Sequence, residues 1–167
     1  LGNAKYQAVV QEMQNIANKN PTRVEMISIG TNSQGQEIKG LKIGNGPTSS
    51  LVVATHHGNE YGSTAVALGF AESLAANPIK NQTVYVIPVL NISGFDRKNR
   101  YESNLATMID SNRDYPGPCV KGKTFKLKST QALAQFLVDK NIVISATLHT
   151  YFPAVVYPWG ISTQDLS

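Results

Sequence analysis

Residues 51–60 read LVVATHHGNE, and this stretch decides the fold. The wholly apolar run from Leu51 to Ala54 is typical of a strand that is buried on both faces of a sheet. The Ala- and Leu-rich segment from Ser63 to Ala76 then predicts a helix that ends before Asn77 and Pro78. A polar cluster between such a strand and helix lies where α/β proteins gather their ligands, so we expect the functional site here.

Similar patterns extend along the chain in both directions. The expected elements are a helix over 5–18, a hairpin of 24–29 and 37–43, buried strands at 83–90 and 142–148, and a helix over 130–139. Residues 93–128 form one long irregular region, and loops of that length are usually functional. We therefore expect an α/β fold with a mixed, mostly parallel sheet flanked by helices.

The composition excludes several classes of protein. With 167 residues, 41% of them hydrophobic and 16% charged, the chain fits one compact domain and is neither disordered nor a coiled coil. Its longest apolar runs, such as Val84 to Leu90, are far short of the roughly 20 residues of a membrane span. A single cysteine excludes an internal disulfide and a cysteine-based zinc finger. Any metal must therefore bind to histidine and carboxylate side chains.

Nucleotides and nucleic acids are not expected as partners. The net charge of +4 is too small to require nucleic acid, and the lysines between positions 121 and 128 have only Phe125 as an interleaved aromatic residue. Residues 117–124 match the letters of a phosphate-binding loop. However, no buried strand precedes them and no helix-start signal follows, so we interpret them as an ordinary loop.

Three residues have the types and spacing of a catalytic zinc site. His57 and Glu60 are three positions apart, and in a helical turn this spacing directs both side chains to one side. His149 directly follows the last predicted strand, at a comparable strand end. Two histidines and one glutamate with an open fourth position form a catalytic zinc set. Taken alone, the short motif also fits ordinary polar loop residues.

Further features in the same order make the chain resemble the zinc carboxypeptidases of the funnelin family, whose hallmark is His-x-x-Glu followed much later by His. The resemblance implies one zinc ion on His57, Glu60 and His149. It also implies that Asn112 and Arg113 hold the terminal carboxylate of the substrate, because the family has an Asn-Arg pair for this purpose.

The resemblance assigns three more residues. Asp110 falls where the family has a carboxylate behind the first zinc histidine, and such an acceptor would fix the tautomer of that histidine. Arg97 matches the arginine that polarises the scissile carbonyl, and Arg100 takes its place if the register shifts. Tyr151 falls where the family has a tyrosine that lines the substrate cleft.

The chain departs from the family pattern at three places. Ile92 and Ser93 replace the usual Pro-Asp, and Asp114 precedes the aromatic Tyr115. The family's general-base glutamate and capping tyrosine come from a later part of the domain, and Asp165 is the only carboxylate after His149. We therefore expect residues 1–167 to be the N-terminal portion of a carboxypeptidase-like catalytic domain, incomplete at its C-terminal side and cut from a longer chain or completed by a companion polypeptide.

The resemblance implies a metallocarboxypeptidase that hydrolyses the C-terminal peptide bond of a peptide with a free carboxylate, using zinc-activated water. One alternative is a zinc-dependent acylamino-acid deacylase of the aspartoacylase type, which shares a His-Gly-Asn-Glu motif. Another is an inactive zinc-containing domain that still binds carboxylates. Low charge and many Asn and Gln residues favour an exported protein, periplasmic or extracellular. Side-chain specificity stays open, as does the choice between peptidoglycan stem peptides and ordinary peptides.

Overall fold

The computed structural model describes residues 5–117, 122–151 and 153–156. Asp165 and residues 118–121 of the phosphate-loop-like pattern lie outside the described residues. No helix in the described part of the chain is long and apolar enough to cross a membrane.

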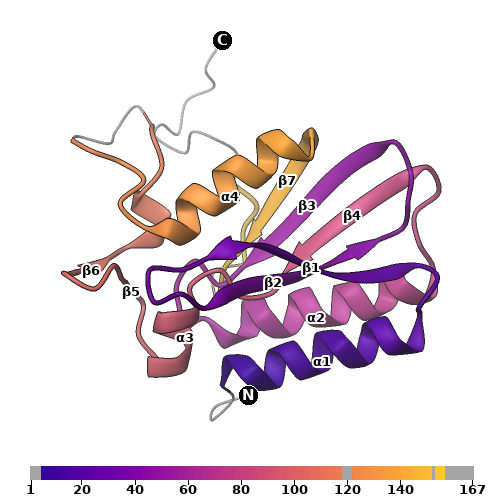
Figure 1. Ribbon diagram of the computed structural model, residues 1–167, viewed down its shortest axis with the longest axis horizontal. Helices are drawn as coiled ribbons and strands as arrows, with labels where there is room; N and C mark the ends of the chain where they lie inside the picture. The colour runs from indigo at the N-terminus through magenta and orange to yellow at the C-terminus, as the bar shows by residue number, and fades with distance from the viewer. Residues whose placement is uncertain (1–4, 118–121, 152, 157–167) are drawn as a thin grey trace.

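A five-stranded mixed sheet forms the centre of the molecule (Figure 1). Its strands are β1 (Val24–Thr31), β2 (Glu37–Ile43), β3 (Thr48–Ala54), β4 (Gln82–Ile87) and β7 (Ile142–Leu148), in the order β1-β2-β4-β3-β7. β3 is parallel to β4 and to β7, whereas β2 is antiparallel to β1 and to β4. Four of these strands therefore run in one direction, which confirms the mixed, mostly parallel sheet expected from the sequence.

Helices cover both faces of the sheet (Figure 1). α1 (Tyr6–Lys19) and α2 (Tyr61–Ala76) lie side by side on one face, and α4 (Lys128–Asp139) packs on β1 from the other. The approach of α4 is close, because a Cβ atom on Gly30, whose φ is +142°, would lie 2.9 Å from the Cβ of Ala132. All three helices and the hairpin of β1 and β2 confirm the sequence prediction to within a few residues.

The core lies on both faces of the sheet, under the pair α1 and α2 on one face and under Leu133 and Phe136 of α4 on the other. α1 contributes Val9, Met13 and Ile16 to it, spaced as the apolar positions of one helix face. β4 is buried along nearly its whole length, as predicted for a strand with neighbours on both edges. Both β3 and β4 end beside the loop of residues 55–60, which carries the predicted site, so this core holds the strands that support that loop.

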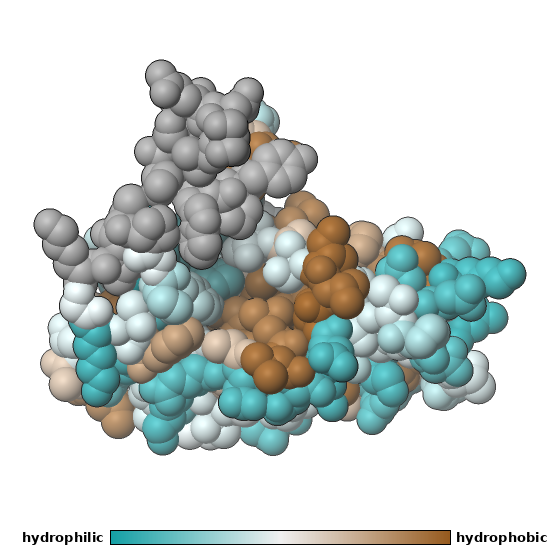
Figure 2. Space-filling model, turned by 90° about the horizontal axis from the view of Figure 1, so that it is seen from above, coloured by the Kyte–Doolittle hydropathy of each residue, from teal (hydrophilic) through white to brown (hydrophobic). Residues whose placement is uncertain are grey.

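The prediction for residues 142–148 is right about the strand and wrong about its burial. The strand exists, but most of β7 is exposed, including Val143 at 70% and Ile144 at 67%. β7 is the edge strand of the sheet and, in the described part of the chain, pairs only with β3. Figure 2 shows hydrophobic side chains gathered on the face seen from the side of α4 and β7.

The region 93–128 is more structured than its sequence indicates. It begins within the short helix α3 (Ile92–Arg97), which the side chain of Asn91 caps by accepting a hydrogen bond from the Gly94 N–H at 2.7 Å. Two short strands, β5 (Glu102–Ser103) and β6 (Met108–Ile109), follow as an antiparallel ribbon. A single 3₁₀ turn, η1 (Ser111–Arg113), then leads toward α4.

Candidate metal centre

The loop between β3 and α2 leaves the strand at Thr55, a residue with unusual backbone geometry. Thr55 is fully buried and has φ = +60°, a left-handed value that is strained for a β-branched side chain. Its hydroxyl group hydrogen-bonds with the Thr64 hydroxyl at 2.6 Å, the Ser63 hydroxyl at 3.2 Å and the carbonyl oxygen of Pro88 at 3.0 Å. These contacts hold the turn that directs the next residues out of the sheet.

Gly58 and Glu60 set the path of the loop after this turn. A Cβ atom on Gly58 would overlap the backbone of Gly94, so a larger residue would displace α3. Glu60 is the N-cap residue of α2, and its carbonyl oxygen accepts hydrogen bonds from the Ser63 N–H and hydroxyl. The carboxylate of Glu60 is thereby held at the start of a helix and close to the end of β3.

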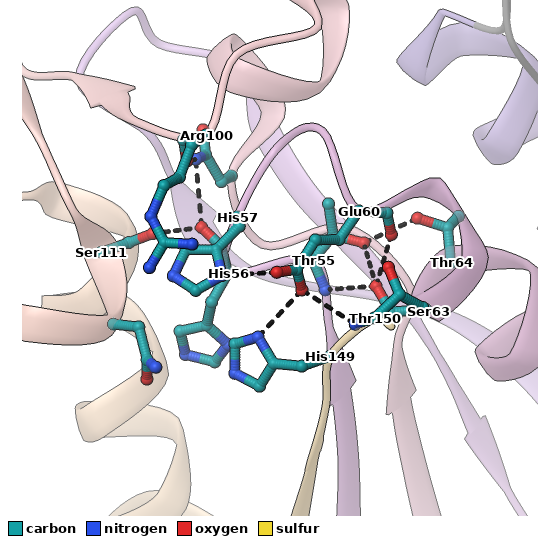
Figure 3. A network of polar contacts seen from close by, with 12 residues as sticks. Thr55, His56, His57, Glu60, Ser63, Thr64, Arg100, Ser111, His149 and Thr150 are labelled. Carbon is teal, nitrogen blue, oxygen red and sulfur yellow. Dashed lines mark hydrogen bonds and ion pairs between the residues drawn. The ribbon is translucent and has the colours of Figure 1, made fainter. Parts of the chain in front are cut away.

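The structure brings His57, Glu60 and His149 together (Figure 3). His57 Nδ1 lies 2.8 Å from Glu60 Oε1, and His149 Nδ1 lies 2.9 Å from Glu60 Oε2. One ligand atom from each of the three residues lies within 4.8 Å of the others. Two imidazole nitrogens and a carboxylate at this separation form a donor set that suits zinc.

The charge state of the Glu60 carboxyl group favours metal binding at these three residues. Burial acts to raise the pKa of its carboxyl group, but hydrogen bonds from His57, from the Thr150 N–H at 3.1 Å and from His149 outweigh burial and lower the pKa. Glu60 is therefore ionised at neutral pH, which is the form that binds a cation.

Asp110 contacts the opposite side of the His57 ring. Its Oδ1 lies 3.2 Å from His57 Nε2, and its Oδ2 accepts hydrogen bonds from Arg100 Nε at 3.1 Å and Nη2 at 3.0 Å. Burial would raise the pKa of Asp110, but the contacts with Arg100 and His57 and the Asn112 N–H lower it. Asp110 is thus an ionised acceptor for the imidazole ring of His57, on the side of the ring opposite Glu60.

His56 is buried beside these residues but is not part of the group. It is 3% exposed, and its Nε2 lies 2.9 Å from the Tyr115 hydroxyl group, while its buried Nδ1 has no hydrogen-bond partner among the described residues. Burial, with the charges of His149 and His57, lowers the pKa of His56 to about 3. Its imidazole is therefore neutral at physiological pH.

The remaining predicted residues lie at different places. Asn112 and Arg113 are in η1, directly after Asp110; Asn112 is half-buried and Arg113 is exposed. Arg97 is the exposed last residue of α3, and Tyr151 is 97% exposed. We call residues 110–115 the clamp segment, because they contain the pair expected to hold a substrate carboxylate.

The sequence predicts a role for Arg100 only if it replaces Arg97. In the structure, however, Arg100 is the arginine that contacts Asp110. The sequence also predicts no role for Tyr115. The spacing of 59 residues between Tyr115 and His56 follows no helix or strand period, so no local pattern could have revealed their contact.

Comparison with known proteins identifies the family of the chain. Residues 9–167 match the family model described as zinc carboxypeptidase. Human carboxypeptidase B is 26% identical over 93% of this chain and 47% of its own length, and human carboxypeptidase D is 22% identical over 93% of this chain and 13% of its own length. Bovine thrombin-activatable fibrinolysis inhibitor superposes with a TM-score of 0.83 at 20% identity, over 97% of this chain and 65% of that one. The chain spans about half the length of carboxypeptidase B. The chain belongs to the zinc carboxypeptidase family.

Proposed function

We propose that residues 1–167 form part of the catalytic domain of a metallocarboxypeptidase, which hydrolyses the C-terminal peptide bond of a peptide with a free carboxylate. The observation that supports this most is the meeting of His57, Glu60 and His149 next to the clamp segment. The family match supports the same activity. No specific observation favours the deacylase or the inactive carboxylate-binding alternative.

The described residues fit one zinc ion. His57 Nδ1, His149 Nδ1 and a Glu60 oxygen are the proposed ligands, and their two nitrogens and one oxygen leave a fourth position open, as catalytic zinc sites do. Zinc in such a site acts as a Lewis acid and lowers the pKa of water. With zinc on Nδ1, the Nε2–H group of His57 would donate a hydrogen bond to Asp110. This hydrogen bond would fix the orientation of the ring and make Nδ1 a better ligand.

The clamp segment would bind the substrate. Arg113 offers a guanidinium group suited to bidentate pairing with a carboxylate, and Asn112 adds an amide donor beside it. Because Asp110 contacts His57 and also accepts a hydrogen bond from the Asn112 N–H, the carboxylate of the substrate would be bound a short distance from the scissile bond. This distance would restrict cleavage to the last residue of a peptide.

Arg97 and Tyr151 complete the proposed site on the resemblance alone. Arg97 would polarise the scissile carbonyl and face the developing oxyanion, and Tyr151 would line the cleft. Two N–H groups of Arg100 already pair with Asp110, which supports the choice of Arg97 for the carbonyl.

Two further parts of the proposal come from the sequence. The general base would be the glutamate that the family carries in a later part of the domain, on a longer chain or on a companion polypeptide. An exported location is proposed from the low fraction of charged residues.

A pair of binding measurements tests the function. We would load the 167-residue chain with zinc and titrate it by calorimetry with N-acetylated dipeptides ending in Phe, Leu, Lys or Glu, each as free acid and as C-terminal amide. At least one acid should bind about tenfold or more tightly than its amide, since hydrogen bonds to a charged group contribute about 1.5–3 kcal/mol. Arg113→Ala should remove this preference. Equal binding of acid and amide across the panel would contradict the proposal.

A further inference from the structure

The buried ring of His56 connects the metal centre with the clamp segment. Its centroid lies 5.9 Å from that of His149 and 5.7 Å from that of Tyr115. The hydrogen bond between its Nε2 and the Tyr115 hydroxyl group measures 2.9 Å. His56 therefore contacts a proposed zinc ligand and the end of the clamp segment at the same time.

The clamp segment contacts His56 and His57 at three points. Asp110 Oδ1 contacts His57 Nε2 at 3.2 Å. The Ser111 hydroxyl donates to the backbone carbonyl oxygen of His56 (Figure 3). The Tyr115 hydroxyl contacts the imidazole ring of His56. Asn112 and Arg113 lie between these points of attachment.

Asp114 attaches the segment on its other side, at the start of α4. Its carboxylate accepts hydrogen bonds from the Lys126 N–H at 2.8 Å, the Leu127 N–H at 2.9 Å and the Thr130 hydroxyl at 2.6 Å. Asp110 also supports a proposed zinc ligand, and Asp114 also holds the residues that lead into α4, so loss of either would disturb more than the clamp segment. Tyr115 has no such second polar contact among the described residues.

We propose that His56 and Tyr115 are positioning residues, whose hydrogen bond fixes Asn112 and Arg113 at the distance from the metal ligands that a C-terminal amino acid requires. This inference rests on the proposed function. A small displacement of a bound substrate lowers its reaction rate strongly, because the reacting bond must lie in the correct position while the rest of the substrate is bound. A rigid clamp segment would therefore favour a free carboxylate one residue from the bond at the metal.

The test uses three variants of the zinc-loaded 167-residue chain. Tyr115→Phe removes the hydroxyl group that contacts His56. His56→Gln keeps a polar group at that position and serves as the conservative replacement. Tyr6→Phe is the control, because it removes a buried tyrosine hydroxyl group that lies on α1 and has no contact with the clamp segment. This hydroxyl donates to the Glu37 carbonyl oxygen at 2.9 Å and accepts from the Lys39 N–H at 2.7 Å.

Two quantities are measured for each variant: the zinc dissociation constant, by competition with a chromophoric chelator, and the affinity ratio of the preferred dipeptide acid to its amide. We expect Tyr115→Phe to lower the ratio about tenfold, the effect of one hydrogen bond to a polar group, while zinc affinity changes less than about twofold. His56→Gln should retain more of the ratio than Tyr115→Phe, and Tyr6→Phe should retain all of it. A loss of stability alone would lower thermal midpoints without changing the ratio.

The outcomes separate the two proposals. If the wild-type chain does not distinguish acid from amide, the proposed function is wrong and this inference falls with it. If the wild-type chain distinguishes them and Tyr115→Phe does so equally well, only the inference is wrong. The inference is also overturned if Tyr115→Phe weakens zinc binding as much as it weakens binding of the acid.

Discussion

Replacing Asp110 with asparagine tests how the chain holds His57, the first proposed zinc ligand. The substitution keeps the shape of the side chain and one oxygen that can accept from His57 Nε2, but it removes the negative charge. It also places an amide NH₂ group against Arg100 Nε and Nη2, which now lie 3.1 and 3.0 Å from Asp110 Oδ2. The oxygen must then face either His57 or Arg100, so one of these two contacts is lost.

We expect Asp110→Asn to weaken zinc binding about 10- to 100-fold, or about 1.4–2.8 kcal/mol, as for other acceptors behind metal-binding histidines. The assay is competition with a chromophoric chelator at neutral pH. Asp139→Asn is the control, since Asp139 is exposed at the end of α4 and its carboxylate accepts from the Gln135 side chain. If Asp110→Asn binds zinc within twofold of the wild type, the role given to Asp110 is refuted.

Three further predictions concern stability. Removing zinc with a chelator should lower the thermal midpoint, because zinc at 100 times its dissociation constant contributes about 2.7 kcal/mol; His149→Ala should abolish the response to zinc, and a response that persists would contradict the ligand set. Thr55→Val should cost about 1–3 kcal/mol in urea unfolding, because the buried Pro88 carbonyl loses its donor, whereas Thr55→Ser should cost less. Burial raises the pKa of Glu102 to about 7, well above the value near 4.5 of an exposed glutamate. The folded state therefore binds this proton more tightly, so its contribution, about 3 kcal/mol, is complete below about pH 4.5 and is lost as the pH rises through 7. Glu102→Gln should flatten that dependence, and the exposed Glu12→Gln should not.

The meeting of the three proposed metal ligands could be predicted because their geometry is local or follows from topology. His57 and Glu60 lie in one strand-to-helix turn, and their spacing alone directs them to one side. His149 follows a strand that is parallel to β3, so both strands end at the same edge of the sheet. Parallel neighbours made this contact predictable across 89 residues.

Other features could not be predicted, since they depend on packing between distant segments. The apolar sequence of β7 indicates a strand but says nothing about what covers it, and Val143 is 70% exposed. The contact of Tyr115 with His56 joins a loop to a strand end without any periodic signal. One sequence signal does indicate the start of helix α3, namely the capping residue Asn91.

The central claim is that one zinc ion binds to His57, Glu60 and His149. An anomalous difference map at the zinc absorption edge, from crystals of the zinc-loaded chain, tests it most directly. We predict one peak about 2.0–2.2 Å from Nδ1 of both histidines and from a Glu60 oxygen. A zinc peak at any other group of residues, or no peak at these three in a chain that is otherwise folded as described, would contradict it.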